Sequence, residues 1–370
     1  MVGDYSEMDQ EKLVRDSEKH VGNCIISCRD AYADSSIRIK DCWKVISDGY
    51  DRNHLLSVGS QAVLIFVHGF NNDLVQAVGL GDGLLSNLHC AASRDTSEDP
   101  LRKVNFFTFC WRGDFYPDFR MAEDAADRLA PCFANFLSEL HQQSLSSAHP
   151  VQAVLITHSL GARIALQALR SLSTNKTTPW IDCLLMIQPA ISLGLVTKGT
   201  YWEAIPRRYT TPGFKKPGDL PDVNFHIPHL YAGPNDPFYM DPDEKHGDHV
   251  GPLDTEGFFF KTFAFAGEVF ATMSGADSVL KNAYYQYSVL LDSSGIAYHP
   301  DLRSALGSLT EEDWLETRAY LSFPPNFLPI HLSPGESAPC IRDHGQVFVE
   351  DGQAIVDLLY EIALGGHVSP

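Results

Sequence analysis

Short apolar runs alternate with amphipathic stretches of helical period between about residues 60 and 190. This alternation predicts β-strands and α-helices in turn, which is typical of a mostly parallel sheet. The runs are almost continuously apolar, as expected for strands that are covered by helices on both faces. The predicted strands are Val63 to Val67, Val104 to Cys110, Gln152 to Thr157 and Cys183 to Gln188.

Two of the intervening stretches have apolar residues at helical spacing. Leu129, Phe133, Phe136 and Leu140 recur at i, i+4, i+7 and i+11, which predicts one helix, with Pro131 marking a kink or a late start. Residues 160–172 have a stripe of alanines and leucines on one side, which predicts a second helix.

The flanking segments divide the chain into three predicted parts. The core spans residues 1–237; it begins with an irregular acidic tail and includes an irregular stretch at 191–225 that is a candidate part of a lid. Residues 238–330 are dense in aromatic side chains and too long for a plain connection, which predicts a lid or cap insertion. Residues 331–370 complete the core and end in a helix. Further strands are predicted at Cys24 to Cys28, Cys42 to Ser47 and His229 to Gly233.

Composition narrows the class of protein. The hydrophobic content of 44% allows a large core, and the net charge of −19 disfavours nucleic acids and anionic membrane surfaces as partners. The sequence has no apolar run of 18 residues, no basic-then-apolar leader and no dense cysteine framework. We therefore expect a cytoplasmic protein without a membrane partner; the oligomeric state stays open.

The strongest chemical signal is the segment 155–162, Leu-Ile-Thr-His-Ser-Leu-Gly-Ala. A strand that runs directly into a helix through a serine between small residues is the arrangement of a nucleophile elbow, although Thr157 replaces the usual first glycine. Ser159 is thus the candidate nucleophile, and the N–H of Leu160 at the helix start is a candidate oxyanion donor. The alternative is a surface serine that caps a helix.

A second motif follows the strand at Val63 to Val67. Residues 68–72 read His-Gly-Phe-Asn-Asn, a glycine turn in the position that supplies the other oxyanion donor in hydrolases built this way. We assign that donor to the N–H of Phe70. His68, Trp111 and His158 are candidate pocket residues. Trp111 follows a predicted strand at the active-site edge of the sheet, where it lines the pocket or is part of the core.

Together these residues resemble the serine α/β-hydrolases, and in particular a largely uncharacterised bacterial-type group with His-Gly-Phe/Tyr-Asn-Asn, a Phe-x-Trp strand end and His-Ser-x-Gly. Here the three motifs are His68 to Asn72, Phe109 to Trp111 and His158 to Gly161. The resemblance covers residues 60–190 well and the last 40 residues loosely, and it implies an α/β-hydrolase fold and a triad in the order serine, acid, histidine. The lid insertion before the catalytic histidine is predicted from the aromatic segment itself.

The resemblance places the acid after the strand that follows Cys183, which points to Asp236 after His229 to Gly233, with Asp241 and Asp243 as substitutes. It places the histidine shortly before the final helix, where His344 fits best. The rivals for the histidine, His246 and His249, follow Asp236 too soon for a strand and helix to intervene, unless an insertion reroutes the chain.

The expected reaction is hydrolysis of a carboxylic ester, through an acyl-enzyme and without a cofactor. The aromatic insertion favours a small-molecule substrate that is bulky and neutral or apolar. Acyl transfer and thioester or amide cleavage use the same triad and stay open, as does a non-catalytic ligand-binding protein of this fold. A structural metal in the loop 236–254 is a further open alternative because the loop is rich in His and Asp, although it lacks the usual zinc spacings.

Overall fold

The computed structural model describes most of the predicted core and parts of the segments that follow it. The described residues are 7–15, 22–33, 38–95, 100–116, 118–147, 150–174, 180–200, 254–256, 259–277, 279–280, 305–318, 321–332, 344, 356–357 and 360.

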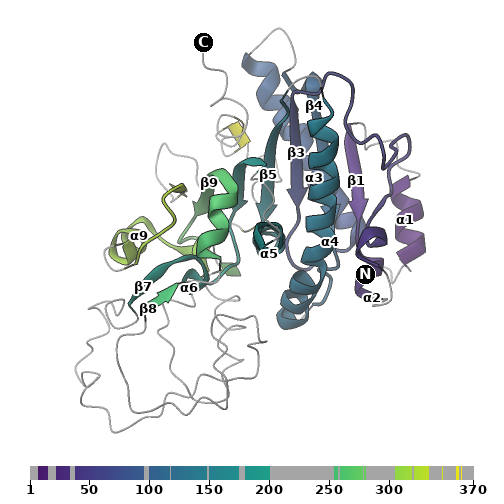
Figure 1. Ribbon diagram of the computed structural model, residues 1–370. Helices are drawn as coiled ribbons and strands as arrows, with labels where there is room; N and C mark the ends of the chain where they lie inside the picture. The colour runs from purple at the N-terminus through teal and green to yellow at the C-terminus, as the bar shows by residue number, and fades with distance from the viewer. Residues whose placement is uncertain are drawn as a thin grey trace, which may run out of the picture.

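An eight-stranded sheet forms the centre of the protein, with the strand order β10-β9-β6-β5-β3-β4-β1-β2 (Figure 1). Only β2 is antiparallel to its neighbour; the other adjacent pairs are parallel. The strands are β1 (Asn23–Ser27), β2 (Lys44–Val45), β3 (Ala62–Val67), β4 (Val104–Cys110), β5 (Gln152–His158), β6 (Ile181–Ile187), β9 (Ala266–Met273) and β10 (Phe327–His331).

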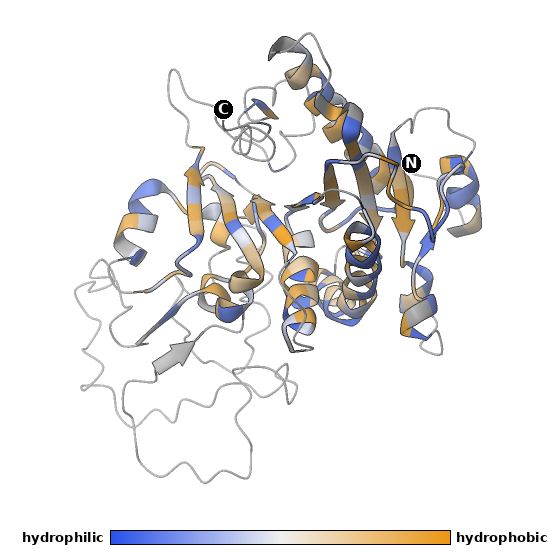
Figure 2. Ribbon diagram, turned by 45° about the horizontal axis from the view of Figure 1, so that its top comes forward, coloured by the Kyte–Doolittle hydropathy of each residue, from blue (hydrophilic) through white to orange (hydrophobic). Residues whose placement is uncertain are grey.

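Helices cover both faces of the sheet, because β3 to β6 present apolar side chains on both. On one face α3 (Leu74–Asp95) packs on the sheet, and α1 (Glu7–Arg15) packs on α3. On the other face α4 (Phe119–Leu145) and α5 (Gly161–Thr174) pack on the sheet and on each other. In Figure 2 the helices alternate orange and blue around their circumference, while the strands between them are mostly orange. This confirms the predicted parallel sheet with two helical layers.

The helix predictions need two refinements. Helix α4 begins at Phe119 and continues through Pro131, so the proline does not mark a late start. The predicted acidic tail is irregular only in part, because Glu7–Arg15 form α1.

The segment 238–330 differs most from its prediction as a lid. Strand β9 pairs with β6 and β10 pairs with β9, so both are part of the central sheet. Phe259 and Phe263 are fully buried in the main core. The described part of this segment therefore extends the α/β core, because its aromatic side chains are needed to cover the added strands.

The remaining elements are short. Strands β7 (Lys198–Thr200) and β8 (Asp254–Glu256) form an antiparallel ribbon that brings together the two ends of the segment 201–253. The predicted strand at His229 to Gly233 lies outside the described residues, as does most of the predicted final helix. The short helices are α2 (Asp30–Ala33), α6 (Leu193–Val196), α9 (Glu311–Arg318) and the 3-10 turns Ile39–Asp41, Pro100–Lys103, Phe260–Phe265 and Leu306–Ser308.

Candidate active site

Three residues with unusual backbone conformations lie at one edge of the sheet, where the parallel strands β3, β5 and β6 end. Asn71, Ser159 and Gln188 have φ angles of 60°, 52° and 45°, and they are the non-glycine residues with positive φ in the described part of the chain. Such conformations cost about 1–3 kcal/mol each and persist where the surrounding structure imposes them, often at functional sites. In open α/β sheets this edge is also where ligands bind.

Ser159 stands on a sharp turn between β5 and α5, as its motif predicts. Its N–H donates to the carbonyl of Ile187 at 3.0 Å, and its own carbonyl accepts from Ala190 at 3.2 Å, so the turn is tied to the end of β6. Gly161 follows because a Cβ there would lie 2.5 Å from the carbonyl oxygens of Val67 and His68. The serine therefore needs a glycine two positions later for α5 to start this close to β3.

The loop after β3 packs against the serine. A Cβ on Gly69 would lie 2.7 Å from the Cβ of Ser159, so glycine is required here as well. Within the described residues, the N–H groups of Phe70 and Leu160 have no hydrogen-bond partner, although Leu160 is fully buried. Free N–H groups beside a nucleophile are what an oxyanion site requires.

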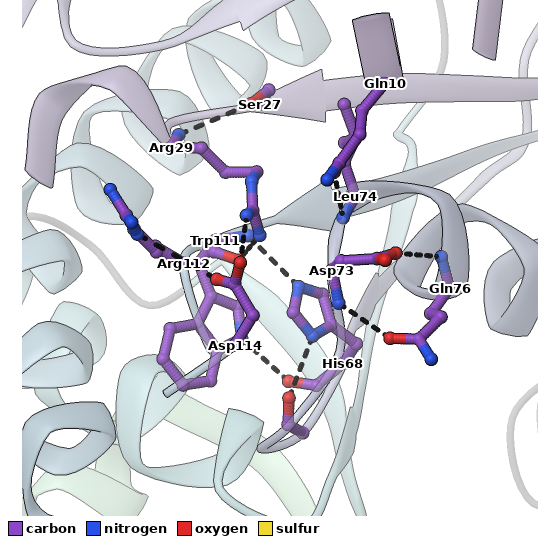
Figure 3. A network of polar contacts seen from close by, with 11 residues as sticks. Gln10, Ser27, Arg29, His68, Asp73, Leu74, Gln76, Trp111, Arg112 and Asp114 are labelled. Carbon is purple, nitrogen blue, oxygen red and sulfur yellow. Dashed lines mark hydrogen bonds and ion pairs between the residues drawn. The ribbon is translucent and has the colours of Figure 1, made fainter. Parts of the chain in front are cut away.

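His68 holds this loop from inside the protein (Figure 3). The N–H of Trp111 donates to His68 Nε2 at 3.1 Å, so Nδ1 carries the proton and donates to the carbonyl of Gly69 at 2.9 Å. Burial lowers the pKa of His68 to about 4, in agreement with this neutral form. The indole N–H of Trp111 donates to the carbonyl of His68 at 2.8 Å.

His68 and Trp111 are both predicted pocket residues, with a position in the core as the alternative for Trp111. Both side chains are fully buried, so they support the loop after β3 from inside the protein. A buried arginine extends this support: Arg29 donates to the carbonyl of Trp111 at 3.0 Å and pairs with Asp114 at 2.9 Å (Figure 3). The N–H of Asn71 donates to the carbonyl of Gly113 at 2.7 Å, which closes the connection between the two loops.

His344 lies beside His158, the residue before Ser159. His158 Nε2 is 2.7 Å from the carbonyl oxygen of His344, and because a carbonyl only accepts, this nitrogen must be protonated. The two rings are 4.7 Å apart. Burial, and then the proximity of His344, lower the pKa of His158 to about 3, so His158 stays neutral. His158 thus anchors the main chain of His344 and is itself 6% exposed.

The carboxylate that the structure places against His344 is Asp277, four residues after β9. His344 Nδ1 and Asp277 Oδ2 are 2.8 Å apart. Burial alone would raise the pKa of Asp277, but the hydrogen bond and charge of His344 outweigh it and lower that pKa. Since a carboxylate only accepts, Nδ1 of His344 carries a proton and donates it to Asp277.

Asp277 was not among the predicted site residues. The signal that could have revealed it is the apolar run Ala266 to Met273, followed by a short Ser-Gly-Ala-Asp turn at 274–277. Asp236, Asp241 and Asp243 lie outside the described residues, as do His246 and His249 and the loop 236–253. In the part of the chain that the structure describes, no three His, Cys, Asp or Glu side chains gather as a metal site would require.

The topology and the elbow define an α/β-hydrolase fold. A family described as "Alpha/beta hydrolase of unknown function" (DUF900) matches residues 51–209, which contain the loop after β3 and Ser159 but neither Asp277 nor His344. No curated protein matches the chain. In the described residues, no helix combines the length and apolarity needed to cross a bilayer.

Solved structures with partial similarity include two esterases and a protein named Est1E. An esterase from Pyrobaculum calidifontis has 11% identity and a TM-score of 0.34, with 85% of this chain and 79% of that chain covered. Est1E from Butyrivibrio proteoclasticus has 10% identity and a TM-score of 0.35, with coverages of 84% and 90%. Carboxyl esterase 2 from the fungus Tuber melanosporum has 12% identity and a TM-score of 0.37, with coverages of 84% and 80%.

Proposed function

We propose that the protein is a serine hydrolase that cleaves carboxylic esters, with Ser159 as nucleophile, His344 as general base and Asp277 as the acid. The observation that carries the proposal is the 2.8 Å contact of His344 Nδ1 with the buried Asp277, on a histidine whose main chain is held by the residue before the serine. We assign the acid to Asp277 in place of Asp236 for this reason.

The proposed reaction uses the nitrogen of His344 that does not face Asp277. The Nε2 lone pair of His344 takes the hydroxyl proton of Ser159 as the oxygen attacks the acyl carbon, and Asp277 stabilises the resulting imidazolium. The N–H groups of Phe70 and Leu160 donate to the oxyanion, each contributing about 2.7–4 kcal/mol in the transition state. His344 then gives the proton to the leaving alkoxide, and water hydrolyses the acyl-enzyme by the same steps.

The size of the substrate is not part of this proposal. The expectation of a bulky apolar ester rested on the aromatic insertion, and Phe259 and Phe263 of that segment are buried in the core. Thioesters and amides remain alternative substrates because they need the same groups.

A fluorophosphonate probe tests the nucleophile directly. We expect one adduct, located on Ser159 by peptide mass and lost in Ser159→Ala. The control is Ser146→Ala, an exposed serine at the end of α4, which should label like the wild type. A panel of p-nitrophenyl esters, thioesters and anilides then ranks the substrate classes by kcat/KM. Folded wild-type protein without an adduct, or with an adduct elsewhere, would contradict the proposal.

A further inference from the structure

Gln188 adopts a strained conformation directly after β6. It is completely buried and has a φ of 45°, a region that residues with a Cβ rarely occupy. Two contacts impose this conformation: the N–H of Gln188 donates to Thr272 Oγ1 of β9 at 2.8 Å, and Gly307 packs on the peptide that follows. A Cβ on Gly307 would lie 2.6 Å from the carbonyl carbon of Gln188.

The strained backbone aims the side chain of Gln188 at the proposed acid. Its Nε2 donates to Asp277 Oδ2 at 2.6 Å, which is the same oxygen that accepts from His344. The other oxygen, Oδ1, accepts from the N–H groups of Val279 and Leu280 at 3.0 Å each. Each carboxylate oxygen therefore has two donors, and one donor on the oxygen facing His344 is the Gln188 amide.

The other end of the Gln188 amide shows what determines its orientation. Oε1 is buried and has no hydrogen-bond partner among the described residues. Leaving a buried acceptor unpaired is unfavourable, so the hydrogen bonding of Oε1 does not explain this orientation of the amide. The pose is explained by the donation to Asp277, because turning the amide over would set two oxygens against each other.

We propose that Gln188 is a positioning residue of the active site, which fixes Oδ2 of Asp277 toward His344 by donating a hydrogen bond from a rigid turn. The inference rests on the proposed function, since it assumes that Asp277 and His344 act together in catalysis. Gln188 does not contact the reacting atoms in this role; it acts through the carboxylate.

A neutral donor at this position suits a buried acid. It holds the carboxylate without cancelling the charge that stabilises the imidazolium of His344. The titratable groups that face the Gln188 amide are Asp277 and, beyond it, His344 and His158. A glutamate at 188 would set two carboxylates against each other, and such a pair holds one shared proton.

Two variants test the proposal. Gln188→Met keeps the length of the side chain but donates no hydrogen bond, so we expect kcat to fall about 10–100-fold, with KM within about threefold. Gln188→Glu can donate only while the shared proton is bound, so its kcat/KM relative to the wild type should fall steadily from pH 5 to pH 9. Gln142→Met, on the exposed side of α4, is the matched control and should behave as the wild type.

The outcomes separate this inference from the proposed function. Wild-type kcat in folded Gln188→Met, or a Gln188→Glu ratio that does not change with pH, would overturn the role of Gln188. If Gln188→Met does not fold, the pH dependence of Gln188→Glu decides alone. Asp277→Asn is measured in parallel: if it is inactive while the Gln188 variants match the wild type, only this inference fails. If Asp277→Asn is fully active, the proposed acid is wrong.

Discussion

Replacing Asp277 by asparagine should disable the proposed base while changing few atoms. Oδ1 accepts from the N–H groups of Val279 and Leu280, so the carbonyl of an asparagine must take that place. Its NH2 group then faces Nδ1 of His344, which is also a donor. The histidine relieves this conflict by moving its proton from Nδ1 to Nε2, and the nitrogen facing the serine is then unable to accept a proton.

The expected magnitude follows from this change of tautomer. The corresponding asparagine replacement in a Ser-His-Asp triad lowers kcat by roughly 10⁴, which corresponds to about 5 kcal/mol of transition-state stabilisation. Because the asparagine is nearly isosteric and both backbone hydrogen bonds can be kept, the fold should survive. KM should stay within a few-fold, since Asp277 is fully buried and does not contact the substrate.

The assay is steady-state hydrolysis of a p-nitrophenyl ester by the wild type, Asp277→Asn and Asp236→Asn, with circular dichroism to confirm folding. Asp236→Asn is the matched control because that residue is the acid that the sequence alone suggests. Retention of more than a tenth of wild-type kcat in Asp277→Asn would refute the reasoning. A large loss in Asp236→Asn instead would return the role of the acid to Asp236.

Two further predictions concern stability. His68 and His158 are buried and neutral, with pKa values lowered to about 4 and about 3, whereas an unfolded histidine titrates near 6.5. The unfolded chain thus binds more protons below pH 6.5, so lowering the pH from 7 to 5 should reduce the free energy of unfolding by about 2 kcal/mol per histidine. Urea unfolding at several pH values should show this fall in the free energy of unfolding for the wild type, and a smaller fall for His68→Asn. An equal pH dependence in both proteins would contradict the prediction. Gly161→Ala should lower stability by about 1–3 kcal/mol and reduce activity, because its Cβ meets two backbone oxygens at 2.5 Å. Gly79→Ala, which meets nothing within 4 Å in helix α3, should be neutral or stabilising; similar losses in both variants would refute the steric argument.

The central strands could be predicted because their signal is local. Residues of β3 to β6 are buried on both faces, and this requires near-continuous apolar runs that stand out from the helices between them. The elbow at Ser159 is equally local, since a strand, a turn and a helix are joined within a few residues. The role of His344 as the base stays a prediction. The structure adds that the carboxylate of Asp277 lies beside this histidine.

The acid could not be predicted because its strand has a weak signal. Strand β9 includes the exposed residues Gly267 and Glu268 near its start, and the aromatic residues before it suggested a separate lid. The acid was expected after the strand that follows β6 in sequence. In the sheet, β6 lies between β5 and β9. Strand β9 is far along the chain, and sequence order does not reveal its pairing with β6.

The roles of His68 and Trp111 depended on packing across two strands. Sequence places both at strand ends, where a pocket is expected, but it does not show which way each side chain points. Their mutual hydrogen bonds turn both rings into the protein. A position at a strand end therefore indicates that a residue is close to the site, but it does not indicate that its side chain contacts a ligand.

The pairing of β9 with β6 divides the site between an early and a late stage of folding. Strands β3 to β6 are connected through single helices, whereas β9 begins only after residues 188–265. Contacts between distant parts of a chain form more slowly, because a long loop must be closed before they stabilise anything. The serine turn can thus form while Asp277 and His344 are still unpaired. In the proposed mechanism, a chain that folds in this order has no activity until Asp277 and His344 have joined the serine turn.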